Sequence, residues 1–142
     1  MLDYTAKIAY STEELSQFLI PLSEAGVDIF HASTRRFWEP EFEGSHLNLA
    51  GWAKKITGKP SITVGSVGLD KEFTLEHFLG TQDPHAGTTD INELCSRLNR
   101  GEFDLVALGR AILGDHQWVN KVKAGDFEHI KPFDKTALNT LT

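Results

Sequence analysis

The chain has 142 residues, of which 40% are hydrophobic and 24% charged, a composition typical of one globular domain and not of a disordered chain. Its 14 Lys and Arg residues against 20 Asp and Glu residues give a formal net charge of −6, which disfavours binding to nucleic acid or to an anionic membrane. The one cysteine, Cys95, excludes an intrachain disulfide and a multi-cysteine metal cluster, and the sequence has neither a signal-peptide pattern nor a membrane-length apolar run, so we expect a cytoplasmic protein.

The first predicted helix begins at a capping-box pattern. Ser11 and Glu14 stand at the spacing at which a hydroxyl and a carboxylate satisfy free backbone N–H groups. Apolar residues follow at helical spacing until Gly26, and Pro21 should kink this helix because it has no N–H to donate. Residues 27–33 are rich in β-formers and predict a strand.

The same order of helix, glycine and short apolar strand occurs twice more. A helix over 49–56 precedes a strand over 61–64, and a helix over 91–98 precedes a strand over 103–108. A last helix is predicted over 115–125. This order is typical of parallel βα units, and the nearly continuous apolar strands indicate a sheet that is covered on both faces.

Three parallel strands are too few for a complete (β/α)8 barrel, which needs about 250 residues. A small open sheet is the alternative, but a nucleotide-binding sheet would show a glycine-rich loop after its first strand, and residues 31–34 contain no glycine. Residues 69–89 predict a loop with one short helix, and residues 127–142 show no clear period.

Glycines follow the second and third predicted strands instead. Gly65 and Gly68 follow the second strand, and Gly109 and Arg110 follow the third. Two such strand ends form the phosphate site that is found after the last two strands of a barrel, because glycine lets backbone N–H groups approach an anion and arginine adds a bidentate charge. The alternative is that the glycines only form a tight turn and that Arg110 pairs with an acid.

Residues 64–69 and 103–113, read together with residues 30–44, resemble the end of the Old Yellow Enzyme family. Members of this family are FMN-dependent NAD(P)H:flavin oxidoreductases, or ene-reductases, built on a (β/α)8 barrel. The resemblance covers nearly the whole chain. It implies an α/β fold in which residues 1–142 form one C-terminal partial-barrel FMN-binding domain, with three βα units that resemble strands six to eight and a preceding helix.

The resemblance implies two groups of site residues. Backbone N–H groups of the turn after strand seven would hold the FMN phosphate, the residues after strand eight would complete that site, and NAD(P)H would be the reductant of a small enone-type substrate. The phosphate group comprises Ser66, Val67, Gly68, Gly109 and Arg110.

The loop after strand six would lie over the flavin and the substrate mouth. This second group comprises Arg35, Arg36, Phe37 and Trp38. The alternative for these four residues is structural: the arginines would pair with the glutamates at 39, 41 and 43, and the aromatic rings would pack the loop.

The family's first five strands have no counterpart in this chain. With them are missing the His and Asn or His pair that holds the substrate carbonyl, the tyrosine proton donor and an arginine near the flavin ring, so no catalytic residue is assigned. Three hypotheses follow: part of an ene-reductase completed by another chain, a non-catalytic FMN-binding or phosphate-binding partial barrel, or an inactive truncation product. A partial barrel leaves two strand edges unpaired, so we expect self-association or a partner chain.

Two further residues have structural interpretations. His31 lies in a predicted strand, and we expect a core or site-wall histidine there and not a metal ligand. Cys95 lies on the predicted apolar face of its helix, which predicts a buried, inert thiol. The remaining histidines show no ligand spacing, and no metal site is predicted.

Overall fold

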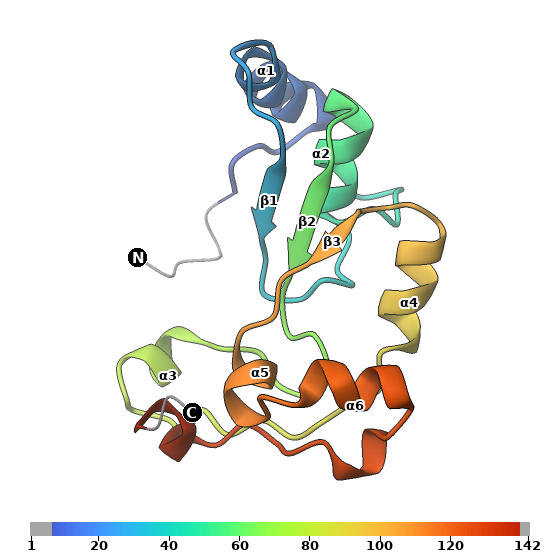
Figure 1. Cartoon of the computed structure of the whole chain (residues 1–142). Helices are drawn as coiled ribbons and strands as arrows, with labels where there is room; N and C mark the ends of the chain where they lie inside the picture. Colours follow the sequence, from blue (N-terminus) through green and yellow to red (C-terminus); the bar gives the residue numbers. More distant parts are fainter. Residues whose placement is uncertain (1–6, 140–142) are drawn as a thin grey trace. The chain divides into compact units, whose positions relative to one another are not determined.

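The structure is a computed structural model that describes residues 7–139, except for the side chains of Leu75 and Phe78 (Figure 1). Helices alternate with three parallel strands, which confirms the predicted α/β class, and the sheet is open. None of the described helices combines the length and the apolar character that a bilayer span requires. In chain order the elements are α1 (Thr12–Glu24), β1 (Phe30–Ser33), α2 (Leu49–Thr57), β2 (Ser61–Val64), α3 (Leu75–Phe78), α4 (Asn92–Asn99), β3 (Leu105–Val106), α5 (Arg110–Gly114), α6 (Trp118–Ala124) and the 3-10 helices η1 (Phe127–His129) and η2 (Lys135–Asn139).

The contacts divide the chain into two compact units, each built from two separate segments. Unit 1 contains residues 7–65 and 92–107, and unit 2 contains residues 66–91 and 108–139 of the described chain. Unit 1 holds the sheet with α1, α2 and α4, and unit 2 holds α3, α5, α6 and the 3-10 helices.

The sheet of unit 1 has the strand order β1-β2-β3. His31 lies opposite Ile62, and Ile62 lies opposite Leu105, in a parallel register. The second strand has the predicted bounds, and the first is shorter than predicted. The third has only two residues where six were predicted, although bonds from Asp104 N–H and Ala107 N–H to β2 carbonyls extend its pairing on both sides.

The helix α1 begins after its predicted N-cap, Ser11. The Glu14 N–H donates to Ser11 Oγ (3.2 Å), which confirms the predicted cap, whereas the Glu14 carboxylate accepts from the N–H of Tyr10 (2.8 Å) and not from that of Ser11 as a full capping box would. Pro21 lies inside α1 without ending it, and the helix runs on to Glu24. Gly26 follows with a φ of +105°.

The two faces of the sheet differ, and the expectation that both would be covered is wrong for the described residues. Ala32, Ser61 and Thr63 are buried on the face that α2 covers. On the other face Leu105 is 52% exposed, and His31 is exposed as well, so His31 is no core residue. Helices of unit 1 cover one face, and no described element of this unit forms a second layer.

The prediction of a buried Cys95 is also wrong. The helix α4 directs Leu94 and Arg97 inward, and Cys95 is exposed one position away from Leu94. On the buried face of α4, Arg97 and not Cys95 lies beside Leu94.

In unit 2, Asp115 joins three segments. Its carboxylate accepts bonds from Lys121 Nζ (2.6 Å), from the Lys131 N–H (2.9 Å) and from the Gln117 N–H (3.0 Å). Burial by itself would raise the pKa of Asp115, but these hydrogen bonds outweigh it and hold the pKa below its ordinary value. The last helix therefore begins at Trp118 and not at the predicted Asp115, whose side chain is used for tertiary contacts.

This arrangement predicts a pH-dependent contribution to stability. The folded-state pKa lies below the ordinary 3.8, so the stabilisation is complete above that value and is lost as the pH falls through the folded-state pKa. We expect Asp115→Asn to lower the free energy of unfolding by about 2–3 kcal/mol at neutral pH. Urea unfolding at several pH values should show this difference shrinking in acid. The exposed control Glu128→Gln should change little at any pH, and a pH-independent loss in Asp115→Asn would contradict the prediction.

Candidate functional site

The turn after β2 has an unusual backbone. Gly65, Ser66 and Gly68 have φ values of +134°, +50° and +68°, and the Leu69 N–H donates to Ser66 O (3.2 Å). Within residues 7–139 the amides of Val67 and Gly68 donate no hydrogen bond. Successive amides in such a turn form an anion-binding nest, so the turn has donors available for a phosphate oxygen.

Residues 67–69 of this turn pack against other parts of unit 2. Val67 and Leu69 are each 4% exposed, and the Thr89 N–H donates to Gly68 O (3.1 Å). A Cβ at Gly68 would lie 3.0 Å from the ring of Trp118 on α6, at a φ that favours glycine. The backbone conformation therefore favours glycine at this position, and a side chain would press on the Trp118 ring.

Arg110 begins α5 and is half-buried. Its Nη2 donates to Lys71 O (2.5 Å), and its guanidinium lies 5.6 Å from the ring centre of Phe73 and 5.9 Å from that of Phe133. Its Nη1 is buried without a hydrogen-bond partner. An unpartnered buried donor is costly, which points to a missing acceptor at this position.

Burial and two nearby carboxylates act in opposite directions on the pKa of Arg110. Burial lowers the pKa of Arg110, and the carboxylates of Asp70 and Glu72 act in the opposite direction. These two carboxylates attract the charge of Arg110, so its pairing with an acid stays the alternative to a phosphate contact. The guanidinium keeps its charge and one donor for another anion.

Unit 2 contains all five residues predicted for the phosphate site. The bond from Arg110 to Lys71 and the contact of Gly68 with Trp118 connect the segments after β2 and β3. The amides of Gly109 and Arg110 donate no hydrogen bond in the part of the chain that the structure describes. Gly109 has a negative φ of −110° and open space around it, so its conformation does not itself require glycine.

The predicted substrate-mouth residues lie in unit 1, on the loop between β1 and α2. Phe37 is 5% exposed and packs edge-to-face on Trp38, with 5.1 Å between ring centres. Arg36 pairs with Glu39 at 2.5 Å. Phe37 and Arg36 thus make the structural contacts of the alternative interpretation, and Trp38 keeps 36% of its surface exposed.

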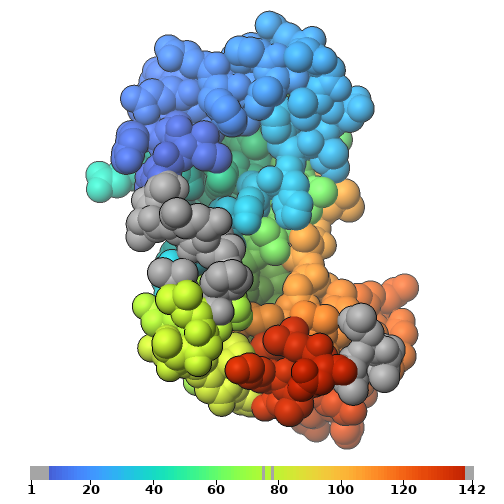
Figure 2. Space-filling model, turned by 90° about the vertical axis from the view of Figure 1, so that its left-hand side faces the viewer, coloured from blue at the N-terminus to red at the C-terminus, as the bar shows by residue number. Residues whose placement is uncertain are grey.

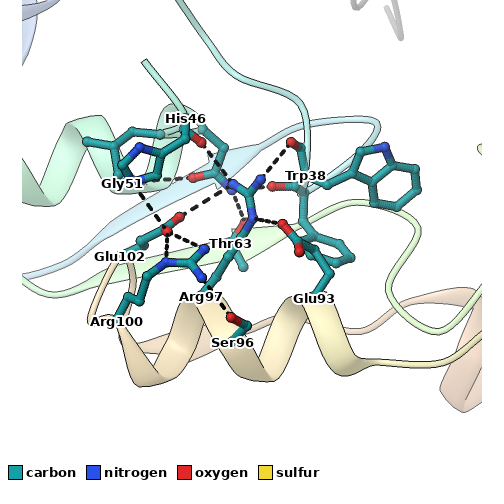
Figure 3. A network of polar contacts seen from close by, with 12 residues as sticks. Trp38, His46, Gly51, Thr63, Glu93, Ser96, Arg97, Arg100 and Glu102 are labelled. Atoms are coloured by element: carbon teal, nitrogen blue, oxygen red, sulfur yellow. Dashed lines mark hydrogen bonds and ion pairs between the residues drawn. The ribbon is translucent and has the colours of Figure 1, made fainter.

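Sequence reasoning missed the residue that holds this loop (Figure 3). Arg97 of α4 is 6% exposed, and it donates to Trp38 O (2.9 Å) and to His46 O (3.0 Å). Its guanidinium also meets the carboxylates of Glu93 (2.7 Å) and Glu102 (3.4 Å). The i,i+4 spacing of Glu93 and Arg97 is that of an ordinary pair on a helix surface, and nothing in the local sequence marks the two distant carbonyls.

Two further side chains complete the polar anchor of the loop. Glu102 has only 3% of its side chain exposed and also pairs with Arg100 at 2.7 Å. Asn48, which caps α2, donates to Phe37 O (2.7 Å) and Thr63 Oγ1 (3.0 Å). Buried side chains at the end of the loop and from the α4 region therefore hold a long loop that contains no helix or strand.

A metal centre has no support in the described part of the chain, where no three His, Cys, Asp or Glu side chains come together in a suitable group. Comparison with models of known protein families gives no match, and no curated protein matches the chain. The geometry of unit 2 is therefore the main basis for a functional argument.

Proposed function

We propose that this chain is the C-terminal part of an FMN-dependent NAD(P)H:flavin oxidoreductase that resembles the Old Yellow Enzyme family, and that unit 2 supplies the FMN phosphate site. The observation that carries the proposal is the buried Nη1 of Arg110, which has no hydrogen-bond partner. The partial (β/α)8 barrel that the resemblance implies is compatible with the open three-stranded parallel sheet.

The residues present fit a phosphate monoester. The turn offers the amides of Val67 and Gly68, the start of α5 offers the amide of Gly109, and Arg110 offers a charged donor. Charge-assisted bonds from arginine to phosphate are stronger than neutral ones and are directional. The bound flavin would supply hydride transfer from NAD(P)H to an activated C=C bond, while these residues bind and orient the cofactor's phosphate.

A second function is favoured by one sequence observation. The chain has no counterpart of the family's carbonyl-binding His and Asn or His pair, so a chain that acts alone would be a non-catalytic FMN-binding or phosphate-binding module. An inactive truncation product is the third candidate. Binding of FMN without turnover of NAD(P)H and an enone would favour the module, and the absence of binding would favour the truncation product.

Fluorescence titration with FMN and with riboflavin tests the phosphate site directly. The two ligands share the flavin ring and differ by the phosphate, so we expect FMN to bind more tightly and inorganic phosphate to compete with it. Arg110→Met should weaken FMN by about 10–100-fold, the equivalent of a charged hydrogen bond of about 1.5–3 kcal/mol, and leave riboflavin binding unchanged.

Lys123→Met is the matched control, because it also removes one positive charge from unit 2, at an exposed position on α6. This variant should bind FMN as the parent chain does. Equal losses in the two variants would show that net charge and not a phosphate contact attracts FMN. Equal affinities of the parent chain for FMN and riboflavin would overturn the phosphate site.

A further inference from the structure

The guanidinium of Arg110 contacts two segments of unit 2 that lie far apart in the sequence. The segment after β2 supplies the Lys71 carbonyl, which accepts from Nη2 (2.5 Å), and the ring of Phe73, whose centre lies 5.6 Å from the guanidinium. The C-terminal segment supplies the ring of Phe133 at 5.9 Å. Figure 2 shows the surfaces of these two segments, in yellow-green and red, beside each other.

The backbone around Phe133 is held firmly, although this part of the sequence shows no periodic pattern. Phe133 is 1% exposed. Its N–H donates to Ala86 O (3.0 Å), and its carbonyl accepts from the Ala86 N–H (3.1 Å). Ala86 has no exposed surface itself. Because both backbone groups of Phe133 are paired with a buried residue, its ring has a fixed place beside Arg110.

The helix α5 is fitted to the same segment at its other end. Arg110 is the first residue of α5 and Gly114 is the last. A Cβ at Gly114 would lie 2.8 Å from Pro132 O and 2.9 Å from the Cα of Phe133, so a side chain there would push the two backbones apart. The segment around Phe133 therefore contacts α5 through its first side chain and through its last residue.

Aromatic rings can hold a guanidinium without occupying the donors that a phosphate needs. The face of a ring attracts a cation, and the flat guanidinium packs well on it. The carboxylates of Asp70 and Glu72 also attract Arg110, but as anions they would compete with a phosphate for it. A long side chain that is already held in place loses less conformational freedom when the ligand binds.

We propose that Phe73 and Phe133 are positioning residues that hold the guanidinium of Arg110 so that its Nη1 faces the phosphate of the ligand. This Nη1 is buried and has no hydrogen-bond partner within residues 7–139. The proposal rests on the proposed function, because it takes the contact between Arg110 and a phosphate as given. It adds the C-terminal segment to the site, through a ring that acts on the ligand only by way of Arg110.

A double-mutant cycle with FMN and riboflavin tests this role. Phe133→Leu keeps an apolar side chain and removes the ring, so we expect FMN to bind about 3–10-fold more weakly and riboflavin to bind as before. In an Arg110→Met background the same substitution should not weaken FMN further, because Phe133 acts through Arg110. Equal losses in the two backgrounds would show a general effect on the fold of unit 2 and overturn the proposal.

Further variants separate the ring from the stability of the fold. Phe73→Leu tests the same prediction at a partly exposed ring, where folding depends less on the side chain, and Phe73→Tyr keeps the ring and should bind FMN as the parent chain does. Phe103→Leu is the control for Phe133→Leu, because Phe103 is also 1% exposed but belongs to unit 1. It should leave FMN affinity unchanged. An FMN affinity in both Phe73→Leu and Phe133→Leu equal to that of the parent chain would overturn the proposal.

NMR of the Arg110 side chain tests the positioning without a flavin. We expect the heteronuclear NOE of its Nε–H group to fall in Phe73→Leu and in Phe133→Leu, because the guanidinium becomes more mobile. An unchanged NOE would mean that Asp70 and Glu72, and not the rings, hold Arg110, and it would overturn this proposal while tighter binding of FMN than of riboflavin kept the proposed function. Equal affinities of the parent chain for the two flavins would overturn the proposed function, and with it the phosphate role of both rings.

Discussion

Gly65→Ala should be among the most destabilising single substitutions in this chain. A Cβ at this position would lie 2.7 Å from both the Arg35 carbonyl carbon and Thr34 O, which are backbone atoms that cannot move aside as a flexible side chain can. The φ of +134° adds strain for any residue with a side chain. We expect a loss of about 3 kcal/mol or more in the free energy of unfolding, measured by urea denaturation.

The effect should also reach the turn after β2. Gly65 O accepts a bond from the Phe37 N–H (3.1 Å), so Gly65 links the loop after β1 to the first residue of the turn at 65–68. An alanine side chain must displace one of the two segments. We therefore expect the amide resonances of residues 34–37 and of 66–68 to shift together.

Gly26→Ala is the matched control for Gly65→Ala. Gly26 also has a positive φ, +105°, but no atom lies within 4 Å of the position that its Cβ would take. In Gly26→Ala the free energy of unfolding should fall only by the cost of placing alanine at a positive φ, about 1–2 kcal/mol. Equal losses in the two variants would mean that the close backbone approach at Gly65 contributes nothing.

Arg97→Met should lower the free energy of unfolding about as much as Gly65→Ala does, because it breaks buried polar contacts. The substitution leaves the carbonyls of Trp38 and His46 without their donor, and it removes one cation from the buried carboxylate of Glu102. Breaking a buried pair by removing one partner costs about 3–5 kcal/mol, and Arg100 should moderate the loss because it also pairs with Glu102. Urea denaturation measures the loss, and hydrogen exchange should show loosening of the 34–47 loop before global unfolding.

Two variants separate this prediction from a general effect of charge. Lys7→Met removes a cation whose ammonium lies 3.7 Å from Glu41 on a half-exposed side chain, and it should cost at most about 1 kcal/mol. The double variant Arg97→Met/Glu102→Met removes the orphaned carboxylate together with its partner, and it should recover part of the stability that Arg97→Met loses. If Arg97→Met were no more costly than Lys7→Met, the loop would not depend on Arg97.

Most helix boundaries were predictable because their causes are local, the start of α6 being an exception. The cap between Ser11 and Glu14 and the positive-φ glycines after α2 and α6 involve residues only a few positions apart. The strand at 61–64 was predictable for a similar reason, since it is a short run rich in β-branched residues between turn residues. The third strand was predicted too long because pairing partners, and not composition, decide where a ladder ends.

The candidate phosphate site was predictable in its residues and not in its surroundings. The glycines at 65 and 68 and the pair Gly109 and Arg110 are visible as motifs in the sequence. That Arg110 would bind Lys71 O and lie near two phenylalanine rings, with one nitrogen left without a partner, depends on contacts between segments about 20–40 positions apart. Such contacts leave no periodic signal in one sequence.

The sequence by itself determined the alternation of helices and parallel strands and the glycine turn, because each depends on neighbouring residues. Only the tertiary structure decided that Arg97 is buried, that Cys95 and His31 are exposed, and that the described elements of unit 1 cover one face of the sheet. The physical reason is that the exposure of a side chain depends on which distant segments pack against it. Arg97 can be buried because two distant carbonyls and two carboxylates satisfy its donors, and of these partners only Glu93 can be inferred from spacing along the chain.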